Sequence, residues 1–282
     1  MYCIIPPNFL AKEIAEKKKE QGFALVFDII DLWPESLPIS KLIPLAKHWR
    51  NLRDGNLKAA DWLVIECERY KEVIEKHVSP KAQMSVIYVL QNPPYDNSET
   101  SEINHDDCIR LCYLGSINNL IDINAICHIV ETIKTIKKIC VEIIGGGKKT
   151  EQVISKLKLA GADVNYHGLV YNESDKSKII SKCHFRLNIY YKSTKIGLTT
   201  KSVDYFKYGV PILNTIDGDT KEIIQKHKVG INIPIEDEAL IREIKEYICD
   251  REGTKIRTKE LFNTTFSSEN YKQMFSFIDK IV

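Results

Sequence analysis

Short apolar runs alternate along this chain with segments in which apolar residues recur at helical spacing. Residues 109–114 (IRLCYL), 140–144 (CVEII) and 185–190 (FRLNIY) have the length and composition of buried strands. Between them, residues 123–136 and 150–160 have the periodicity of amphipathic helices. This alternation predicts an α/β protein with mostly parallel sheets.

The same alternation continues to residue 249. Further strands are predicted at 164–166, 211–214 and 229–233, and further helices at 175–182, 220–226 and 237–249. The strands end in glycine or polar turns, such as Gly115-Ser116, Gly145 to Gly147 and His167-Gly168. Ligands of open parallel sheets bind at the carboxyl ends of the strands, so we expect these turns to converge on one binding site.

The first part of the chain gives a shorter series. Strands are predicted at 24–30, 63–66 and 85–89, and helical segments at 54–61 and 68–77. Pro93 and Pro94 are followed by a polar, acidic stretch, residues 95–107, which is typical of a linker. We therefore place a domain boundary there. The alternative is a long surface loop within one domain.

Residues 197–211 (GLTTKSVDYFKYGVP) predict a loop that turns into a helix and then, after Gly-Val-Pro, a strand. Two threonines, a lysine and a serine lie at the start of that helix, where free N–H groups and the helix dipole favour a phosphate. Asp204 is expected on the first turn of that helix and is a candidate acceptor for hydroxyl hydrogen bonds. The alternative is an ordinary capped helix without a ligand.

Composition excludes several classes of protein. The formal charge of +2 gives no argument for nucleic acid as a partner. No run of about 18 apolar residues predicts a membrane span. The N-terminus has its apolar piece first and its lysines later, which reverses the order in a signal peptide. The eight cysteines are scattered and form no CxxC pair, which favours reduced thiols in the cytoplasm over zinc or disulfides.

Several segments together resemble one enzyme family: the retaining, family 4 type glycosyltransferases of the GT-B fold that build bacterial capsular and other surface polysaccharides. The most specific is 28–36 (DIIDLWPES), which is similar to the Asp-x-x-Asp-Leu-Trp-Pro-Glu motif of that family. The other similar segments, in family order, are 113–116 (YLGS), 143–147 (IIGGG), 164–170 (VNYHGLV), 197–211 and 266–269 (FSSE).

The resemblance implies a GT-B-like α/β fold with two Rossmann-like domains. Residues 1–95 would form an acceptor-side domain, residues 108–255 the nucleotide-sugar domain, and residues 256–282 a tail whose helix, capped by Ser267 or Ser268, crosses back to the first domain. The first domain of the family is longer than residues 1–95. We therefore expect a shortened N-terminal domain. Three explanations are open: the gene is a fragment, a second polypeptide completes the domain, or the reduced domain is sufficient by itself.

The resemblance also implies the chemistry. A hexosyltransferase of this type moves a sugar from a nucleoside diphosphate donor to a hydroxyl of a glycan or lipid-linked acceptor with retention of configuration, without a metal or another cofactor. Asp31 and Lys201 would be the catalytic residues. The donor would contact Gly115, Ser116, Gly145, Gly146, Tyr166, His167, Gly168, Val170, Thr199, Thr200, Lys201, Ser202 and Asp204.

The chain departs from the family pattern at two places. Ile196 stands where the family has the first of two acidic residues, and residues 116–122 contain no arginine or lysine. Lys201 is therefore the expected substitute cation, with Lys192 and Lys195 as runners-up. These departures leave a second hypothesis open: a non-catalytic or split-gene subunit that keeps nucleotide binding only.

Two residue groups have alternative interpretations. Asp31 is a candidate N-cap of a helix that would start at Pro34. The lysine-rich helix expected at 11–21 is by default a solvated face, and the alternative is contact with the inner face of the membrane, near lipid-linked acceptors. Neither GxGxxG nor a P-loop occurs, which disfavours a dehydrogenase or a nucleotidase.

Overall fold

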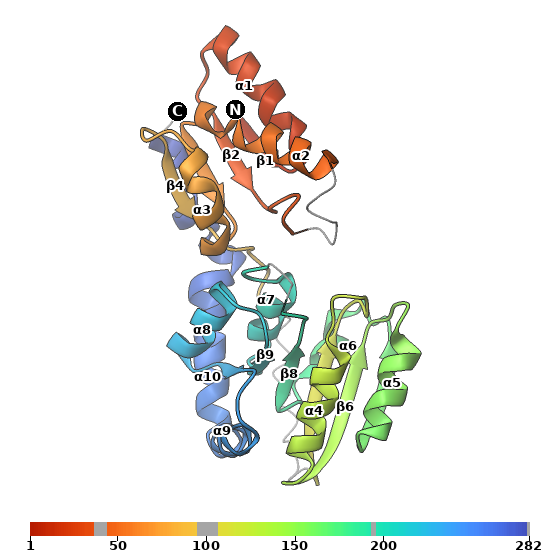
Figure 1. Cartoon of the computed structure of the whole chain (residues 1–282). Helices are drawn as coiled ribbons and strands as arrows, with labels where there is room; N and C mark the ends of the chain where they lie inside the picture. The colour runs from red at the N-terminus through yellow and green to blue at the C-terminus, as the bar shows by residue number, and fades with distance from the viewer. Residues whose placement is uncertain (37–43, 95–106, 193–195, 281–282) are drawn as a thin grey trace. The chain divides into compact units, whose positions relative to one another are not determined.

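The structure is a computed structural model that describes residues 1–36, 44–94, 107–192 and 196–280. It contains two compact units (Figure 1). Unit 1 comprises Met1–Leu90, Lys195–Gly197 and Asn270–Val282, and unit 2 comprises Gln91–Thr194 and Leu198–Glu269. Each unit is built on one sheet whose strands are all parallel, which confirms the predicted α/β class.

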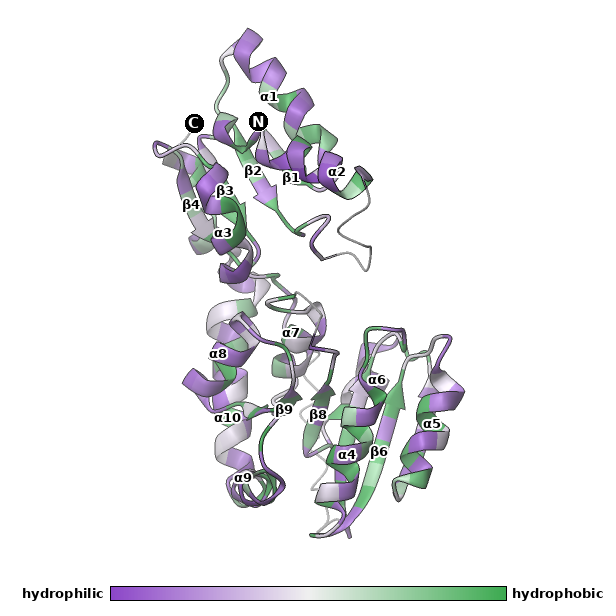
Figure 2. Ribbon diagram, viewed as in Figure 1, coloured by the Kyte–Doolittle hydropathy of each residue, from purple (hydrophilic) through white to green (hydrophobic). Residues whose placement is uncertain are grey.

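Unit 1 has a four-stranded sheet with the order β1-β2-β3-β4. Its strands are β1 (Tyr2–Ile5), β2 (Val26–Ile29), β3 (Trp62–Ile65) and β4 (Gln83–Val86), and its helices are α1 (Phe9–Gln21), α2 (Pro44–Asp54), α3 (Glu68–Ile74) and α11 (Tyr271–Met274). Helix α1 buries Ala11 and Ala15 and leaves most of its lysines exposed, and it is largely hydrophilic in Figure 2. Gly22, with φ 72°, ends it by donating its N–H to Lys18 O.

Unit 2 has a six-stranded sheet with the order β10-β9-β8-β5-β6-β7. Its strands are β5 (Cys108–Leu114), β6 (Lys138–Ile144), β7 (Ala162–Gly168), β8 (Phe185–Asn188), β9 (Ile212–Asn214) and β10 (Gly230–Asn232). Its helices are α4 (Ile123–Ile133), α5 (Thr150–Leu159), α6 (Glu173–Ile180), α7 (Thr200–Lys207), α8 (Asp219–His227), α9 (Asp237–Cys249) and α10 (Arg251–Leu261). The strand order reverses between β5 and β8, so this sheet has its topological switch point there.

Alternate residues of the unit 2 strands face two different helix layers. Leu111 of β5, Val141 of β6 and Leu187 of β8 belong to a buried apolar cluster that also includes residues of α4, α5 and α9. The intervening residues of β8, Arg186 and Asn188, face α7 on the other side of the sheet. Strand residues therefore place α7 next to the switch point.

Two of the predicted elements differ in the structure. In the helical segment expected at 54–61, Asp54 is the last residue of α2 and Leu57–Ala59 form a 3-10 turn, so the main helix of that region lies before the segment. No long final helix follows Ser267 among the described residues up to 280. Short turns and α11 occur instead. The ring of Phe277 stacks on Trp62 with centroids 4.4 Å apart, and the ring of Phe275 lies beside that of Phe277. Residues two positions apart do not lie on the same face of an α-helix, so this packing requires a non-helical backbone.

The C-terminal tail is divided between the two units. Helix α10 lies in unit 2, and the chain joins unit 1 from Asn270 onward. The linker predicted at 95–107 lies, except for Asp107, outside the described residues.

All eight cysteines are free, and Cys249 is the exposed one. Among the described residues, no helix combines the length and the apolar character that a membrane span requires.

Candidate functional site

Lys201, in the first turn of α7, reaches the glycine turn that follows β5. A Cβ atom on Gly115 would lie 2.5 Å from Lys201 Cε, so the lysine stem crosses the space that only a glycine leaves open. Lys201 Nζ donates to Tyr113 Oη at 3.1 Å and lies over the rings of Tyr113 and Tyr190, 5.0 and 5.5 Å from their centroids. Burial lowers the pKa of Lys201 to about 8. A partly desolvated cation therefore lies at the switch point.

The glycine turns after β5, β6 and β7 are held together by backbone hydrogen bonds. Gly115 N donates to Ile144 O at 2.8 Å, and Gly145 N donates to Gly168 O at 2.7 Å. A Cβ atom on Gly145 would lie 2.1 Å from Gly115 O, and one on Gly146 would lie 3.3 Å from the Tyr166 hydroxyl. The turns predicted to bind the donor are thus brought together, and Ser116 beside them is exposed.

The start of α7 is organised by Thr199. This residue is the N-cap, and its Oγ1 accepts from Ser202 N at 3.0 Å. Thr200 is exposed and Thr199 is partly exposed, whereas Ser202 is fully buried and its hydroxyl lies 2.9 Å from Thr199 Oγ1. Thr199, Thr200 and the first N–H groups of the helix therefore face the position where a phosphate is expected, and Ser202 lies behind them.

Asp204 lies one turn further along α7 than expected, since the helix begins at Thr200. Burial raises the pKa of its carboxyl group, although a hydrogen bond from Gln91 and the charges of Arg186 and two lysines act in the opposite direction. Gln91 Nε2 also donates to Thr200 O at 3.4 Å. Gln91 thus connects Asp204 with Thr200 at the start of α7, and the role of Asp204 as an acceptor for hydroxyl groups of the donor stays a prediction.

Tyr166 and His167, both predicted to contact the donor, lie in two different environments. Tyr166 lies against the Gly145–Gly147 turn, whereas His167 Nε2 lies 2.7 Å from Glu142 Oε2. Glu142 is buried, and although burial alone would raise its pKa, hydrogen bonds from His167, Asn165 and Arg110 lower it. Tyr166, Gly168 and Val170 therefore remain available for a donor contact at the end of β7. His167 is instead bound to Glu142 of the neighbouring strand β6.

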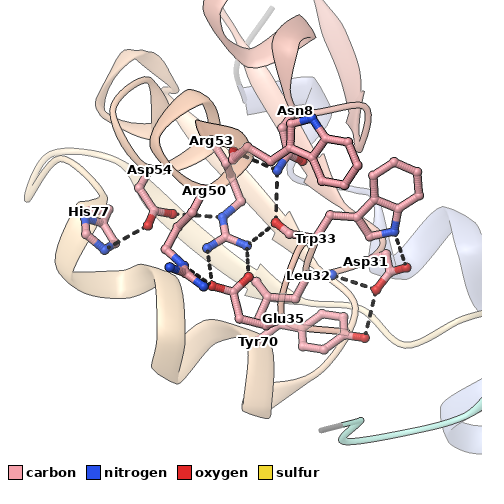
Figure 3. Close-up of polar contacts among 11 residues, drawn as sticks. Asn8, Asp31, Leu32, Trp33, Glu35, Arg50, Arg53, Asp54, Tyr70 and His77 are labelled. Atoms are coloured by element: carbon pink, nitrogen blue, oxygen red, sulfur yellow. Dashed lines mark hydrogen bonds and ion pairs between the residues drawn. The ribbon is translucent and has the colours of Figure 1, made fainter. Parts of the chain in front are cut away.

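In unit 1, the predicted catalytic Asp31 follows β2 (Figure 3). Its Oδ1 accepts from Leu32 N at 2.7 Å, its Oδ2 accepts from Trp33 Nε1 at 2.9 Å, and the Tyr70 hydroxyl lies 3.4 Å from Oδ1. Residues 33–36 form a turn, so the N-cap alternative is not realised at Pro34. The carboxylate is oriented by three donors and retains lone pairs for a ligand.

The rest of the Asp-Leu-Trp-Pro-Glu motif anchors this turn to α2 (Figure 3). Arg53 is fully buried, and its Nη1 donates to Trp33 O at 2.8 Å and to Glu35 Oε2 at 2.9 Å. Burial alone would raise the pKa of Glu35, but hydrogen bonds from Arg53 and Arg50 lower it. The most specific sequence motif of the chain therefore acts largely through internal contacts that hold Asp31 at the strand end.

Glu66 lies at the carboxyl end of β3, next to the end of β2, because its N–H donates to Ile29 O at 3.1 Å. Burial, together with the negative charges of Asp31 and Asp28, raises the pKa of Glu66 to about 8. At neutral pH its carboxyl group is therefore protonated and can donate a hydrogen bond. Among the described residues, no group of three His, Cys, Asp or Glu side chains is arranged to hold a metal ion.

Replacing Glu66 by glutamine is expected to stabilise unit 1 at high pH. The folded state retains this proton up to about pH 8, whereas an unfolded glutamate loses it near pH 4.3, so rising pH lowers the free energy of unfolding across that window. Glu66→Gln removes the dependence and should gain on the order of 4 kcal/mol at pH 9 relative to pH 5. All three tryptophans lie in unit 1, so tryptophan fluorescence in urea titrations reports this change.

The matched control is Glu68→Gln, two residues away, whose exposed carboxylate pairs with Lys71 at 3.2 Å. This variant should keep the pH dependence of the wild type. A Glu66→Gln variant with the same pH dependence as the wild type would show that Glu66 is ionised throughout.

Sequence reasoning missed three residues of the site: Tyr113, Tyr190 and Gln91. The signal for Tyr113 was present, since it lies two residues before Gly115 in a segment already recognised. Tyr190 and Gln91 gave no local signal. Their proximity to Lys201 and Asp204 follows from the strand order and from the place where the chain enters unit 2. Of the cations considered, Lys201 lies at the switch point, Lys192 is exposed, and Lys195 lies outside the described residues.

A family model described as "Glycosyl transferases group 1" matches residues 109–250, which lie entirely in unit 2. No curated protein matches the chain by sequence.

Solved structures extend the likeness to both units. Sucrose-phosphate synthase from Thermosynechococcus elongatus matches with a TM-score of 0.70 and 14% identity, over 99% of this chain and 72% of that one. Anabaena Alr3699/HepE in complex with UDP matches with a TM-score of 0.73 and 12% identity, over 100% and 79%. The lipopolysaccharide outer core galactosyltransferase WaaB matches with a TM-score of 0.67 and 15% identity, over 100% and 75%. At these identities the likeness shows the fold, an α/β fold with two parallel sheets that matches the predicted GT-B class.

Proposed function

The chain belongs to the family of group 1 glycosyl transferases, and we propose that it transfers a hexosyl group from a nucleoside diphosphate donor to a glycan or lipid-linked acceptor with retention of configuration. In this reaction the bond between the anomeric carbon and the diphosphate oxygen breaks. An acceptor hydroxyl oxygen bonds to the same face of that carbon, and its proton passes to the departing diphosphate. We place the reaction in bacterial surface polysaccharide synthesis.

One observation carries this proposal: Lys201, the start of α7 and the glycine turns meet at the switch point of unit 2. A departing diphosphate develops negative charge there, and N–H groups and a desolvated ammonium stabilise such charge strongly. Because these groups supply the positive charge, we propose that the reaction needs no metal. A uridine nucleotide is the favoured donor, since the Anabaena relative was solved with UDP and UDP-glucose.

The decisive experiment has two stages. Thermal unfolding of the whole chain is measured with UDP, GDP and the corresponding sugar nucleotides, and transfer of radiolabelled sugar to lipid and glycan acceptors is measured with and without EDTA. We expect a selective rise in Tm with one nucleotide and transfer that EDTA does not reduce. Absence of any Tm shift would overturn the donor site, and loss of transfer in EDTA would overturn metal independence.

A second candidate function is a nucleotide-binding subunit without transferase activity. One observation favours it: Ile196 occupies the position of an acidic residue in the family pattern. Nucleotide binding without transfer, under conditions in which an added partner restores transfer, would support this candidate. Transfer by this chain alone would eliminate it.

We place the enzyme on the cytoplasmic side, with α1 as a peripheral contact to the inner membrane face. The exposed lysines of α1 support this proposal. Sedimentation with vesicles that contain anionic lipid tests it, and equal recovery of protein with neutral vesicles would contradict it.

A further inference from the structure

A row of asparagines crosses the carboxyl ends of three strands of unit 2, directly behind α7. Asn188 of β8, Asn214 of β9 and Asn232 of β10 are register partners. Asn188 Nδ2 donates to Asn214 Oδ1 at 2.8 Å, and Asn214 Nδ2 donates to Asn232 Oδ1 at 2.9 Å. Asn188 and Asn214 are both buried, so the row is an internal feature that supports the start of α7.

The direction of this row is determined by backbone groups. Asn214 Oδ1 accepts from Ile216 N at 3.1 Å, and Asn214 Nδ2 donates to Ile216 O at 2.8 Å. An N–H only donates and a carbonyl only accepts, so the amide of Asn214 has one possible orientation. Asn188 must then present its Nδ2 to Asn214 Oδ1. Its second hydrogen points to Ser202 Oγ at 3.2 Å.

Ser202 Oγ therefore accepts from the asparagine row, and its own hydrogen needs an acceptor. Ser202 is fully buried, and Thr199 Oγ1, 2.9 Å away, is the acceptor that the described residues offer it. A buried hydroxyl hydrogen without an acceptor is strongly unfavourable. Ser202 therefore donates to Thr199, and Thr199 Oγ1 accepts from both the Oγ–H and the N–H of Ser202.

The hydrogen of the Thr199 hydroxyl is left for an outside acceptor, and Thr199 is partly exposed at the start of α7. We propose that the asparagine row acts through Ser202 to keep Thr199 as a hydrogen-bond donor for an anionic oxygen of the nucleoside diphosphate. This inference rests on the proposed function and adds Asn188, Asn214 and Ser202 as positioning residues. Asn188 Oδ1 has no partner among the described residues. Because an unpartnered buried oxygen lowers stability, the role of Asn188 is better explained by its orientation of Ser202 than by a gain in stability of the fold.

The test compares Thr199→Val, Thr199→Ser and Ser202→Ala in the full chain, with titration calorimetry of UDP, GDP and the matching nucleosides. Thr199→Val is expected to weaken diphosphate binding about tenfold or more, since a hydrogen bond to a charged group is lost. Nucleoside affinity should stay within about twofold of the wild type, because the nucleoside lacks the anionic oxygen. Thr199→Ser, which keeps the hydroxyl, should retain most of the diphosphate affinity.

Ser202→Ala keeps the N-cap bond, because Ser202 donates to Thr199 through its N–H as well. It therefore tests the relay even if Thr199→Val, which loses the cap, does not fold. Ser202→Ala removes the Oγ–H bond that fixes the direction of the Thr199 hydroxyl. It should therefore reduce diphosphate affinity several-fold in the wild type and cause no further loss in the Thr199→Val background. Thr264→Val, at an exposed threonine of unit 2, is the matched control.

The outcomes separate the inference from the proposed function. If the wild type binds neither UDP nor GDP, both are overturned. If the wild type binds a diphosphate and Ser202→Ala binds it equally well, the relay is overturned and the donor site stands. Equal losses of diphosphate and nucleoside affinity in Ser202→Ala would show a general structural role and would also overturn the relay.

Discussion

Replacing Lys201 by methionine is expected to lower the affinity for a nucleoside diphosphate about 10- to 100-fold, which is the value of one charge-assisted hydrogen bond. Methionine keeps the apolar stem that crosses Gly115 and removes the ammonium group that lies over Tyr113 and Tyr190. The loss should be confined to ligands that carry phosphates. Titration calorimetry with UDP and GDP, and with their nucleosides, measures it.

The same substitution is expected to stabilise unit 2 at neutral pH. Burial lowers the pKa of Lys201 to about 8, below the usual value near 10.4, so between these two pH values the unfolded chain binds more protons than the folded one. Stability of the wild type therefore rises with pH through this window. Lys201→Met should gain about 1–3 kcal/mol at pH 7 and lose that advantage above about pH 10.4.

Binding in the wild type should also depend on pH. The charged form of Lys201 is the form that attracts phosphate, so affinity should fall as pH rises above about 8. A bound diphosphate stabilises the ammonium, and the complex should take up protons when it forms near pH 8.5. Calorimetry in buffers of different ionisation enthalpy detects that uptake.

Lys192→Met is the matched control, because Lys192 is an exposed lysine of unit 2 that was a runner-up for the same role. It should change neither stability nor the proton uptake. A larger loss of affinity in Lys192→Met than in Lys201→Met would show that Lys192, and not Lys201, contacts the phosphate.

Unit 2 was predictable from sequence because each buried strand is a continuous apolar run that ends in glycine or a polar turn. The helix at 237–249 was predicted with the bounds of α9 for a related reason: its apolar positions recur at regular helical spacing. In contrast, α2 was missed, since it buries only Ala46 and Arg53. The burial of Arg53 depends on an ion pair with Glu35, 18 residues away, which no local pattern reveals.

The candidate site was predictable in its parts and not in its assembly. The glycine turns and the start of α7 could be recognised locally. The contact between Lys201 and Tyr113 joins residues 88 positions apart. It depends on β8 returning to the other side of β5, and neither composition nor periodicity fixes that strand order. The same return places Asn188 behind Ser202, so the asparagine row was also beyond sequence reasoning.

Replacing Gly145 by alanine is expected to lower the free energy of unfolding of unit 2 by at least about 3 kcal/mol. Gly145 has φ 122°, and an added Cβ atom would lie 2.1 Å from Gly115 O. That oxygen belongs to the backbone of the neighbouring turn, which is fixed by the bond from Gly115 N to Ile144 O. The collision therefore displaces a turn instead of a flexible side chain. Urea unfolding followed by far-UV circular dichroism measures the loss.

Gly168→Ala is the matched control, since Gly168 also has a positive φ, 65°, and a Cβ atom there would have no neighbour within 4 Å. Its cost should be limited to the backbone conformation, about 1–2 kcal/mol. The two variants also differ in what they should do to binding. Gly145→Ala pushes on Gly115, against which Lys201 lies, so diphosphate affinity should fall together with stability. A Gly145→Ala variant no less stable than Gly168→Ala would mean that the turns after β5 and β6 separate readily, and Lys201 would then lack the rigid support that its role in phosphate binding requires.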